Sequence, residues 1–202
     1  AVMRDMGFPA DAVSAVGAVY RGAVTRFATP HGETADIPIR RGTIQGDCLS
    51  PLLWNIFMDP LLRWLEAGGR GYRYTTSDTD VSAAAYADDL ALLTGTRADA
   101  RAQMAKVCRY AEWAGLSVNL SKCAHTALQA GASAHPQEPL PFGPSPTGPK
   151  GKAGIPWLPS EHPYKYLGVE LTATLDWGTD TAEAMARVED RTGVVCSSAA
   201  SL

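Results

Sequence analysis

The stretch that decides the fold is Val81-Ser82-Ala83-Ala84-Ala85-Tyr86-Ala87-Asp88-Asp89-Leu90-Ala91-Leu92-Leu93. Two short apolar runs, residues 81–86 and 90–93, predict a β-hairpin that carries the adjacent carboxylates of Asp88 and Asp89 at its tip. Carboxylates this close repel each other, and a hard divalent cation, Mg²⁺ above all, is the usual compensation. Asp is also a favoured turn residue, so an ordinary structural turn explains the same dipeptide.

The helix predicted before this hairpin covers residues 51–66. Ser50 is a suitable N-cap, Pro51 takes the first helical position, where its missing N–H costs nothing, and Gly68-Gly69 ends the helix. Pro60 is expected to kink it. Its apolar stripe is expected to comprise Leu52, Leu53, Ile56, Phe57, Leu61, Leu62 and Leu65.

The helix predicted after the hairpin covers residues 97–114. Thr96 caps it, with Asp99 three residues later as the acidic partner, and Gly115 suits its C-terminal stop. Its buried stripe is expected to comprise Met104, Val107, Cys108 and Ala111. We expect the hairpin to pack on both helices.

Shorter patterns predict the remaining elements. Asp11 is a plausible N-cap for a helix over residues 11–20, and residues 29–33 have the composition of a hairpin turn between two strand-like runs. Most of the chain's 14 prolines lie in residues 135–163, so this stretch is expected to be a mobile loop without elements. Further strands are expected over residues 23–28, 35–40, 117–120, 124–129 and 164–171, and a last helix from about Thr179.

Composition and pattern together indicate the fold class. The chain has 202 residues, of which 46% are hydrophobic, and this is enough for a packed core. Helices interleaved with antiparallel hairpins predict an α+β fold, with helices packed on one face of an antiparallel sheet. No run approaches the roughly 18 apolar residues of a membrane span. We therefore expect an intracellular protein without membrane contact, and the four cysteines, which lack CxxC spacing, are expected to be reduced thiols.

A second candidate site is the loop Arg40-Arg41-Gly42-Thr43-Ile44-Gln45-Gly46-Asp47-Cys48-Leu49-Ser50-Pro51. Its glycines allow the backbone to approach a ligand closely, and its arginine pair can bind phosphate. The loop leads into a helix N-terminus, which attracts anions. A strand-to-helix turn with a solvated arginine pair explains the same residues, and the net charge of −3 counts mildly against a free-standing nucleic-acid binder.

Together, and in this order, these segments resemble the reverse transcriptases of the non-LTR retrotransposon (LINE-like) type. Four segments carry the resemblance: residues 40–55 resemble motif B, Tyr86-Ala87-Asp88-Asp89 motif C, residues 115–123 motif D, and Tyr166-Leu167-Gly168-Val169 the motif E hairpin. The resemblance covers about residues 7–190.

The resemblance implies the palm of a right-hand RNA-directed DNA polymerase, incomplete at both ends, in which two Mg²⁺ ions serve nucleotidyl transfer. It implies that Asp88 is a metal ligand, with Asp89 as a weaker or more distant partner. It also implies that Lys122 lies near the triphosphate as general acid for pyrophosphate, although an exposed strand lysine is an equal reading.

The resemblance also implies the binding surfaces and the partners. Arg41, Gly42, Gln45 and Gly46 would bind the incoming nucleotide and the template, and Tyr166, Leu167 and Gly168 would hold the primer end. Tyr166 and Leu167 are otherwise ordinary strand core. The implied partners are an RNA template, a DNA primer and deoxynucleoside triphosphates, and the location is nuclear if the protein acts on chromosomal DNA.

The expected organisation is a partial palm over residues 1–175, with the proline-rich insertion, followed by the start of a thumb helix and a ragged tail over residues 176–202. The chain does not begin with Met, and motif A, which supplies another essential aspartate, would precede Ala1. We therefore expect a piece of a longer protein that is inactive by itself. A non-catalytic nucleic-acid-binding or structural remnant of a decayed retroelement is the alternative, and an unrelated metal-dependent hydrolase leaves residues 40–51 unexplained.

Overall fold

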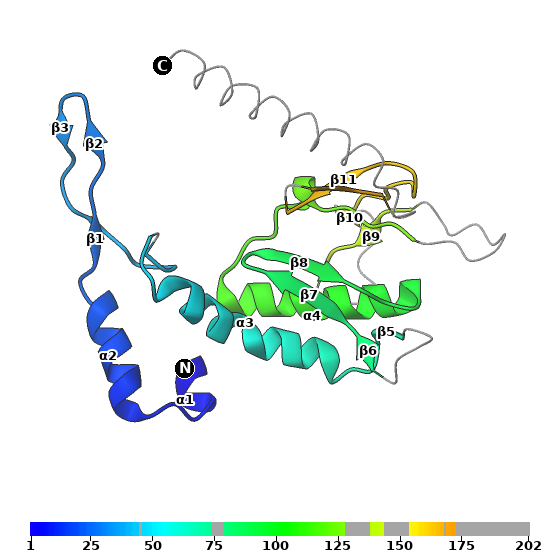
Figure 1. Cartoon of the computed structure of the whole chain (residues 1–202), viewed down its shortest axis with the longest axis horizontal. Coiled ribbons are helices and arrows are strands. Elements are labelled where there is room, and N and C mark those ends of the chain that lie inside the picture. The colour runs from blue at the N-terminus through cyan, green and yellow to red at the C-terminus, as the bar shows by residue number, and fades with distance from the viewer. Residues whose placement is uncertain (45, 74–78, 128–137, 144–153, 168, 173–202) are drawn as a thin grey trace, which may run out of the picture. The chain divides into compact units, whose positions relative to one another are not determined.

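The computed structural model describes residues 1–44, 46–73, 79–127, 138–143, 154–167 and 169–172 (Figure 1). The chain divides into two units, Ala1–Lys106 and Val107–Leu202. Helices alternate with strands that pair, within the described residues, into six separate two-stranded antiparallel sheets. The predicted mixture of helices and antiparallel strands is confirmed, whereas the single sheet expected from the sequence is not formed in these parts of the chain.

The first unit begins with two helices and a long hairpin. These elements are α1 (Val2–Asp5), α2 (Ala10–Tyr20), β1 (Val24–Thr25), β2 (Ala28–Thr29), β3 (Gly32–Glu33) and β4 (Ile37–Pro38). β1 pairs with β4 and β2 with β3, so the predicted hairpin is confirmed. The predicted cap is wrong, because Pro9 is the N-cap of α2 and the carboxylate of Asp11 instead accepts a hydrogen bond from the Ala12 N–H at 2.8 Å.

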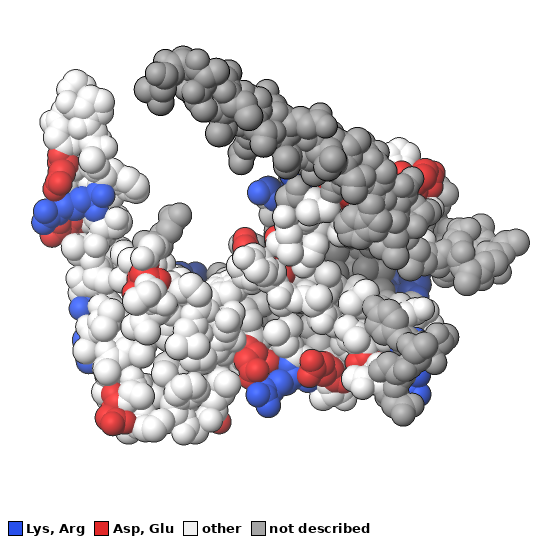
Figure 2. Space-filling model, in the orientation of Figure 1, with Lys and Arg blue, Asp and Glu red and all other residues white. Residues whose placement is uncertain are grey.

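One arginine joins the two arms of this hairpin. Arg26 pairs with Asp36 and also lies 3.5 Å from Glu33, atom to atom. Opposite charges consequently lie next to each other here, and Figure 2 shows blue beside red on the hairpin. Both carboxylates of the hairpin therefore already have a cationic partner.

Helix α3 (Ser50–Glu66) is the central helix of the first unit. The predicted cap is wrong, because Leu49 is the N-cap and Ser50 is the first residue of the helix, with its hydroxyl donating to the Ile44 carbonyl at 2.6 Å. The buried apolar residues of the helix are Met58, Leu61 and Leu65, which recur at helical spacing. The predicted stripe is thus right for its second half and wrong for Leu52, whose side chain is 56% exposed.

The predicted two-carboxylate hairpin is confirmed. After β5 (Tyr72–Arg73) and β6 (Asp80–Val81), which form a small hairpin that the sequence did not predict, β7 (Ala83–Tyr86) pairs with β8 (Asp89–Leu92). The last pair of the register joins Tyr86 to Asp89, so Ala87 and Asp88 form a two-residue turn. β7 contacts α3, as expected.

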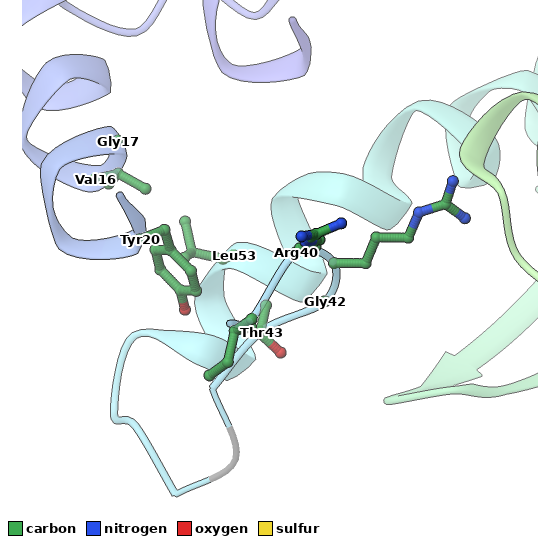
Figure 3. Close-up of a pocket in the computed structure, with 9 residues that line it drawn as sticks. Val16, Gly17, Tyr20, Arg40, Gly42, Thr43 and Leu53 are labelled. Carbon is green, nitrogen blue, oxygen red and sulfur yellow. The ribbon is translucent and has the colours of Figure 1, made fainter. Parts of the chain in front are cut away.

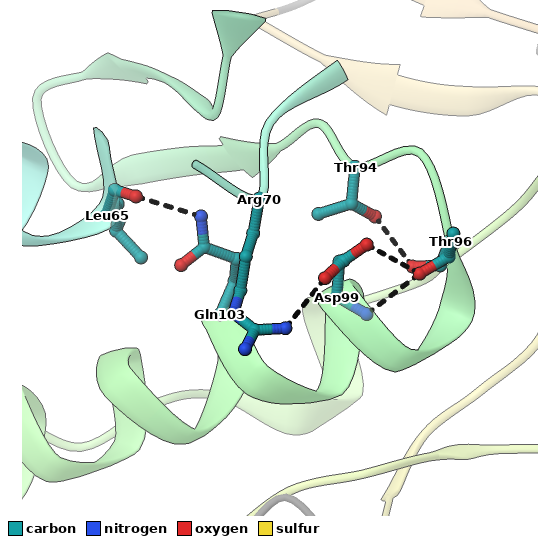
Figure 4. Close-up of polar contacts among 6 residues, drawn as sticks. All are labelled: Leu65, Arg70, Thr94, Thr96, Asp99 and Gln103. Carbon is teal, nitrogen blue, oxygen red and sulfur yellow. Dashed lines mark hydrogen bonds and ion pairs between the residues drawn. The ribbon is translucent and has the colours of Figure 1, made fainter. Parts of the chain in front are cut away.

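Helix α4 (Arg97–Ala114) begins and ends as the sequence predicts. The Thr96 hydroxyl accepts from the Asp99 N–H at 3.1 Å and donates to the Asp99 carboxylate at 2.6 Å, and Arg70 pairs with the same carboxylate at 2.8 Å (Figure 4). These contacts, the Thr96 hydrogen bond first, lower the pKa of Asp99. At the other end Gly115 has φ +67°, and the Leu116 N–H donates to the carbonyl five residues earlier at 2.8 Å, which is a Schellman motif.

Side chains of α4 satisfy the last carbonyls of α3, which have no partner within their own helix. The buried amide of Gln103 donates through Nε2 to the Leu65 carbonyl at 3.0 Å (Figure 4). One turn later Lys106 donates to the Trp64 carbonyl at 2.7 Å. Leu61 and Leu65 are fully buried at this junction. The junction explains how a polar residue comes to lie in the core.

The second unit contains shorter elements: η1 (Leu120–Lys122, a 3₁₀ turn), β9 (Leu140–Pro141), β10 (Gly154–Ile155), β11 (Tyr164–Tyr166) and β12 (Val169–Leu171). The strand predicted over residues 117–120 is wrong, because the Asn119 side chain accepts from the Ser121 N–H and caps the 3₁₀ turn. Of the strand predicted over residues 124–129, His125 forms only an isolated bridge with Trp157, and residues 128 and 129 lie outside the described residues.

The proline-rich stretch, predicted to lack elements, forms strands where it is described. β9 pairs with β10, and Leu140 and Ile155 are each only 3% exposed. The pairing is close because position 154 is a glycine: a Cβ there would lie 2.7 Å from the Leu140 carbonyl oxygen. Residues 135–137 and 144–153 lie outside the described residues, so the prediction of a mobile loop is untested there.

The chain continues into the hairpin of β11 and β12, whose register pairs Tyr166 with Val169. This confirms the hairpin that the resemblance to motif E implies at residues 166–169, whereas the single strand predicted over residues 164–171 is wrong, because two antiparallel strands form there. Gly168, the helix expected from Thr179 and the proposed thumb over residues 176–202 lie outside the described residues. In the part of the chain that is described, no helix is long and apolar enough to cross a lipid bilayer.

Candidate active site

The β7–β8 turn presents two carboxylates to solvent. Asp88 is the second residue of the turn and Asp89 the first residue of β8, and both are exposed. Neither carboxylate has a hydrogen-bond or ion-pair partner among the described residues, in contrast to Asp36 and Asp99, which pair with arginines. Their oxygens are therefore available to a ligand from outside the chain.

A side chain of helix α3 forms a hydrogen bond with this turn. The indole Nε1–H of Trp54 donates to the Ala87 carbonyl at 2.6 Å. Trp54, Met58, Ala85 and Ala87 are among the residues that line a pocket of about 200 Å³ beside the turn. The sequence pattern contained Trp54 within the motif B segment but gave no reason to join it to the turn, because 33 residues separate the two.

The loop before α3 is fastened by three polar side chains. The Tyr20 hydroxyl lies 3.3 Å from both the Asp47 carboxylate and the Ser50 hydroxyl, and Ser50 in turn donates to the Ile44 carbonyl. The loop turns at Gly42 and Gly46, whose φ angles of +82° and +86° favour glycine. These angles give both glycines a role in the turn of the backbone, and the close approach to a ligand stays a prediction.

A pocket of about 410 Å³ opens between α2, this loop and α3 (Figure 3). Its apolar side is formed by residues such as Val16, Tyr20 and Leu53, and its loop side includes Arg40, Arg41 and Gly42. Both arginines are exposed and have no acidic partner in the described parts of the chain. Of the residues predicted to bind nucleotide or template, Arg41 and Gly42 line this pocket, Gly46 lies in the same loop outside its lining, and Gln45 lies outside the described residues.

The remaining predicted site residues belong to the second unit. Lys122 is the last residue of η1 and is exposed, and the Tyr164 hydroxyl donates to its main-chain carbonyl at 2.5 Å. Tyr166 is half-buried at the end of β11, and Leu167 is exposed with φ +51°. Tyr164 was not singled out from the sequence, since a strand tyrosine gives no sign of a main-chain partner 42 residues away.

The metal-binding capacity of the described residues rests on one pair. No group of three or more His, Cys, Asp or Glu side chains that could hold a metal ion occurs within them. Asp88 and Asp89 supply hard oxygen ligands of the kind that Mg²⁺ prefers, but an ion of six or more ligands needs further donors. The pair can therefore form a part of a metal site.

Comparison with known proteins identifies the family. The reverse transcriptase (RNA-dependent DNA polymerase) family matches residues 6–171. The chain is 32% identical over 174 residues to the retrovirus-related Pol polyprotein from the type-2 retrotransposable element R2DM of Drosophila melanogaster, an alignment that covers 85% of this chain and 16% of that protein.

Two further relatives agree. The chain is 36% identical over 102 residues to the Pol polyprotein from the type-1 element R2 of Popillia japonica, which covers 50% of this chain and 17% of that protein. It is 34% identical over 110 residues to the corresponding protein of Nasonia vitripennis, and this alignment covers 54% of this chain and 10% of that protein. The chain spans less than a fifth of the length of these curated relatives. The chain belongs to the reverse transcriptase family of RNA-directed DNA polymerases, and its curated relatives are the Pol polyproteins of R2 non-LTR retrotransposons.

Proposed function

We propose that this chain forms the palm of an R2-type reverse transcriptase and contributes to nucleotidyl transfer in a longer parent protein. The observation that carries the proposal is the exposed pair Asp88 and Asp89 at the tip of the β7–β8 hairpin, where neither carboxylate has a partner among the described residues. Exposed carboxylates that have no partner among the described residues are accessible to a hard cation from solvent. In such an enzyme the substrates are an RNA template, a DNA primer and deoxynucleoside triphosphates.

Asp88 and Asp89 would hold a divalent metal ion, with Asp88 as the first ligand. Their free oxygens fit a hard cation, and Mg²⁺ is the ion that we propose. When bound in a complete site, two such ions activate the primer 3′-hydroxyl and stabilise the leaving pyrophosphate. Because no group of three or more His, Cys, Asp or Glu ligands occurs among the described residues, we propose that the isolated chain does not catalyse polymerisation.

The loop before α3 would bind the nucleic acid and the incoming nucleotide. Arg40 and Arg41 are exposed cations without acidic partners among the described residues, and phosphate is their natural ligand. Gly42 permits the sharp turn that brings Arg41 to the rim of the 410 Å³ pocket. Gln45 and Gly46 complete the proposed surface for the template base and the nucleotide.

The second unit would contribute the proton donor and the primer contact. Lys122 is exposed and its main chain is fixed by Tyr164, so its ammonium group is free to reach a phosphate while its Cα stays in place. We propose that it donates a proton to pyrophosphate. We assign Tyr166, which ends β11, together with Leu167 and Gly168 to the primer end. The nucleus is the proposed location if the target is chromosomal DNA.

The metal assignment is tested on the chain itself. Titration with Mn²⁺, a paramagnetic substitute for Mg²⁺, should broaden the NMR amide signals of residues 86–90 first, and Asp88→Asn should abolish this broadening. The β2–β3 hairpin is the internal control, because Glu33 and Asp36 are already paired with Arg26. Equal broadening at both hairpins would contradict the metal assignment, because Asp88 and Asp89 would then bind Mn²⁺ no better than other surface carboxylates.

Activity is tested by primer extension on an RNA template. The 202-residue chain should give no product, and a longer protein that includes the segment before Ala1 should extend the primer and lose this activity in Asp88→Ala. Losing one member of the charge clamp typically costs on the order of 10³-fold in rate. Extension by the short chain would contradict the partial-site argument. A long form without activity would favour the alternative, a nucleic-acid-binding remnant.

A further inference from the structure

We propose that Trp54 is a positioning residue for the turn that carries Asp88, an inference that rests on the proposed metal role of Asp88. The indole Nε1–H of Trp54 donates to the main-chain carbonyl of Ala87 at 2.6 Å. A side chain of helix α3 thus holds the backbone of the turn at the residue before the carboxylate. The contact is to the main chain, so it acts on the path of the backbone.

The acceptor atom is what gives this hydrogen bond its effect. The Ala87 carbonyl belongs to the peptide group that joins Ala87 to Asp88, and a peptide group is planar from one Cα to the next. Fixing the direction of this oxygen therefore fixes the plane that contains the Asp88 nitrogen and Cα. The direction in which the Asp88 side chain leaves the turn follows from that plane.

A two-residue hairpin turn can hold its central peptide group in either of two orientations. Ala87 has φ +49° whereas the φ of Asp88 is not positive, which is the sign pattern of a type II′ turn. Rotation of the central peptide converts this pattern into type I′, in which both residues have positive φ. Type II′ favours glycine at its first position, but this chain has alanine there, and Asp tolerates the left-handed conformation that type I′ requires. The local sequence therefore does not secure the observed turn, and the Trp54 hydrogen bond supplies the missing constraint.

The indole that makes this bond is itself oriented by its surroundings. Trp54 is half-buried, and its ring centroid lies 5.7 Å from that of Phe57 on the same helix. It lines the 200 Å³ pocket together with Met58, Ala85 and Ala87. A donor packed in this way approaches the turn from one direction.

The test compares two matched substitutions on the same helix. Trp54→Phe keeps an aromatic ring and removes the N–H, and Trp64→Phe does the same at a position whose ring faces Lys106 instead of the turn. In Trp54→Phe we expect the amide–amide NOE between Ala87 and Asp88, weak in type II′ and strong in type I′, to increase. The apparent Mn²⁺ affinity at residues 86–90 should fall about 10-fold, as is typical when a group that orients a metal ligand is removed. Trp64→Phe should change neither.

A rescue variant separates positioning from general stability. Ala87→Gly supplies the residue that type II′ prefers, so Trp54→Phe combined with Ala87→Gly should restore the weak NOE and bring the Mn²⁺ affinity back to within twofold of wild type. Unchanged NOE intensity or unchanged Mn²⁺ affinity in Trp54→Phe would overturn the inference. If Trp54→Phe does not fold, the hydrogen exchange rate of the Trp54 indole N–H is measured in the wild type instead. Protection from exchange would support the hydrogen bond to Ala87, and exchange as fast as in free tryptophan would overturn the inference.

The inference and the proposed function fail in different experiments. Absence of Mn²⁺ broadening at the wild-type turn would overturn the metal role, while a changed NOE in Trp54→Phe would still support the control of the turn by Trp54. Normal Mn²⁺ binding in Trp54→Phe would overturn the positioning role and leave the metal assignment intact.

Discussion

Gln103 makes one good hydrogen bond in the core, and its other amide atom makes none. Its side chain is 0% exposed, and Nε2 donates to the Leu65 carbonyl at 3.0 Å. Oε1 is buried without a donor among the described residues. The Leu65 carbonyl also accepts from the Gly68 N–H at 3.4 Å, so it keeps a partner when Gln103 is replaced. A substitution series at this position therefore separates the value of the bond from the cost of the orphan acceptor.

The estimated energies indicate that leucine at position 103 is at least as stabilising as the native glutamine. Gln103→Leu loses a hydrogen bond worth about 1 kcal/mol and removes an unpaired buried acceptor that costs roughly 1–3 kcal/mol. The free energy of unfolding should thus stay unchanged or rise by up to about 2 kcal/mol. Gln103→Ala should lower it by about 2–4 kcal/mol, because it adds a cavity. Gln103→Glu should be the worst at pH 7, since a buried carboxylate would face the Leu65 carbonyl.

The assay is urea unfolding followed by circular dichroism, with all three variants measured in one buffer. Lys106→Met is the control, because Lys106 caps the neighbouring carbonyl from a more exposed position and its loss should cost under about 0.5 kcal/mol. A loss of more than 1.5 kcal/mol in Gln103→Leu would refute the reasoning. It would mean that Oε1 is hydrogen bonded in solution.

Three further predictions concern a helix end, a cap and a strand pair. Gly115→Ala should lower the free energy of unfolding by about 1 kcal/mol in urea titrations, because Gly115 has φ +67°. Thr96 and Arg70 lower the pKa of Asp99, so its stabilisation is present above the pKa of the unfolded state and is lost as pH falls through the folded pKa. Asp99→Asn should therefore cost about 0.5 kcal/mol at pH 7 and progressively less in unfolding measured toward pH 3. Gly154→Ala should cost about 1–3 kcal/mol in thermal unfolding, since its Cβ would meet main-chain oxygen at 2.7 Å.

Each of these predictions has a control variant or an outcome that would contradict it. Gly17, inside α2, has no positive φ and open space around it, so Gly17→Ala should stabilise where Gly115→Ala destabilises. A constant cost of Asp99→Asn across pH would exclude the titration argument. Wild-type stability of Gly154→Ala would show that β9 and β10 are not closely paired in solution.

The sequence predicted the parts of the fold that depend on local chemistry. The alternation around Asp88 predicted the hairpin, and Thr96 with Asp99 predicted the start of α4, because in both cases the interacting atoms lie within a few residues. The same is true of Gly115 at the end of that helix. For the candidate site, the sequence predicted that Asp88 and Asp89 lie at the tip of one hairpin, and the structure has Asp88 in its turn and Asp89 at the start of β8.

The predictions that failed depend on hydrogen bonds and strand pairings that residue composition does not specify. Ser50 was expected to cap its own helix, but its hydroxyl binds the Ile44 carbonyl in the preceding loop. Residues 117–120 have a strand-like composition, yet Asn119 offers the backbone a local hydrogen bond that favours a 3₁₀ turn. Proline content obscured β9 and β10, because proline is tolerated in a strand pair that, among the described residues, has no further neighbouring strand.

The contact between Tyr164 and Lys122 has a consequence for how the chain can change over evolution. Its acceptor is the main-chain carbonyl, as is that of the Trp54 contact at the β7–β8 turn. Every amino acid has this carbonyl, so mutation at position 122 or 87 alters the chemistry presented there without deleting the anchor. New side chains can thus be sampled at a preserved location, and an experimental replacement such as Lys122→Met reports on the ammonium group with little disturbance of the backbone.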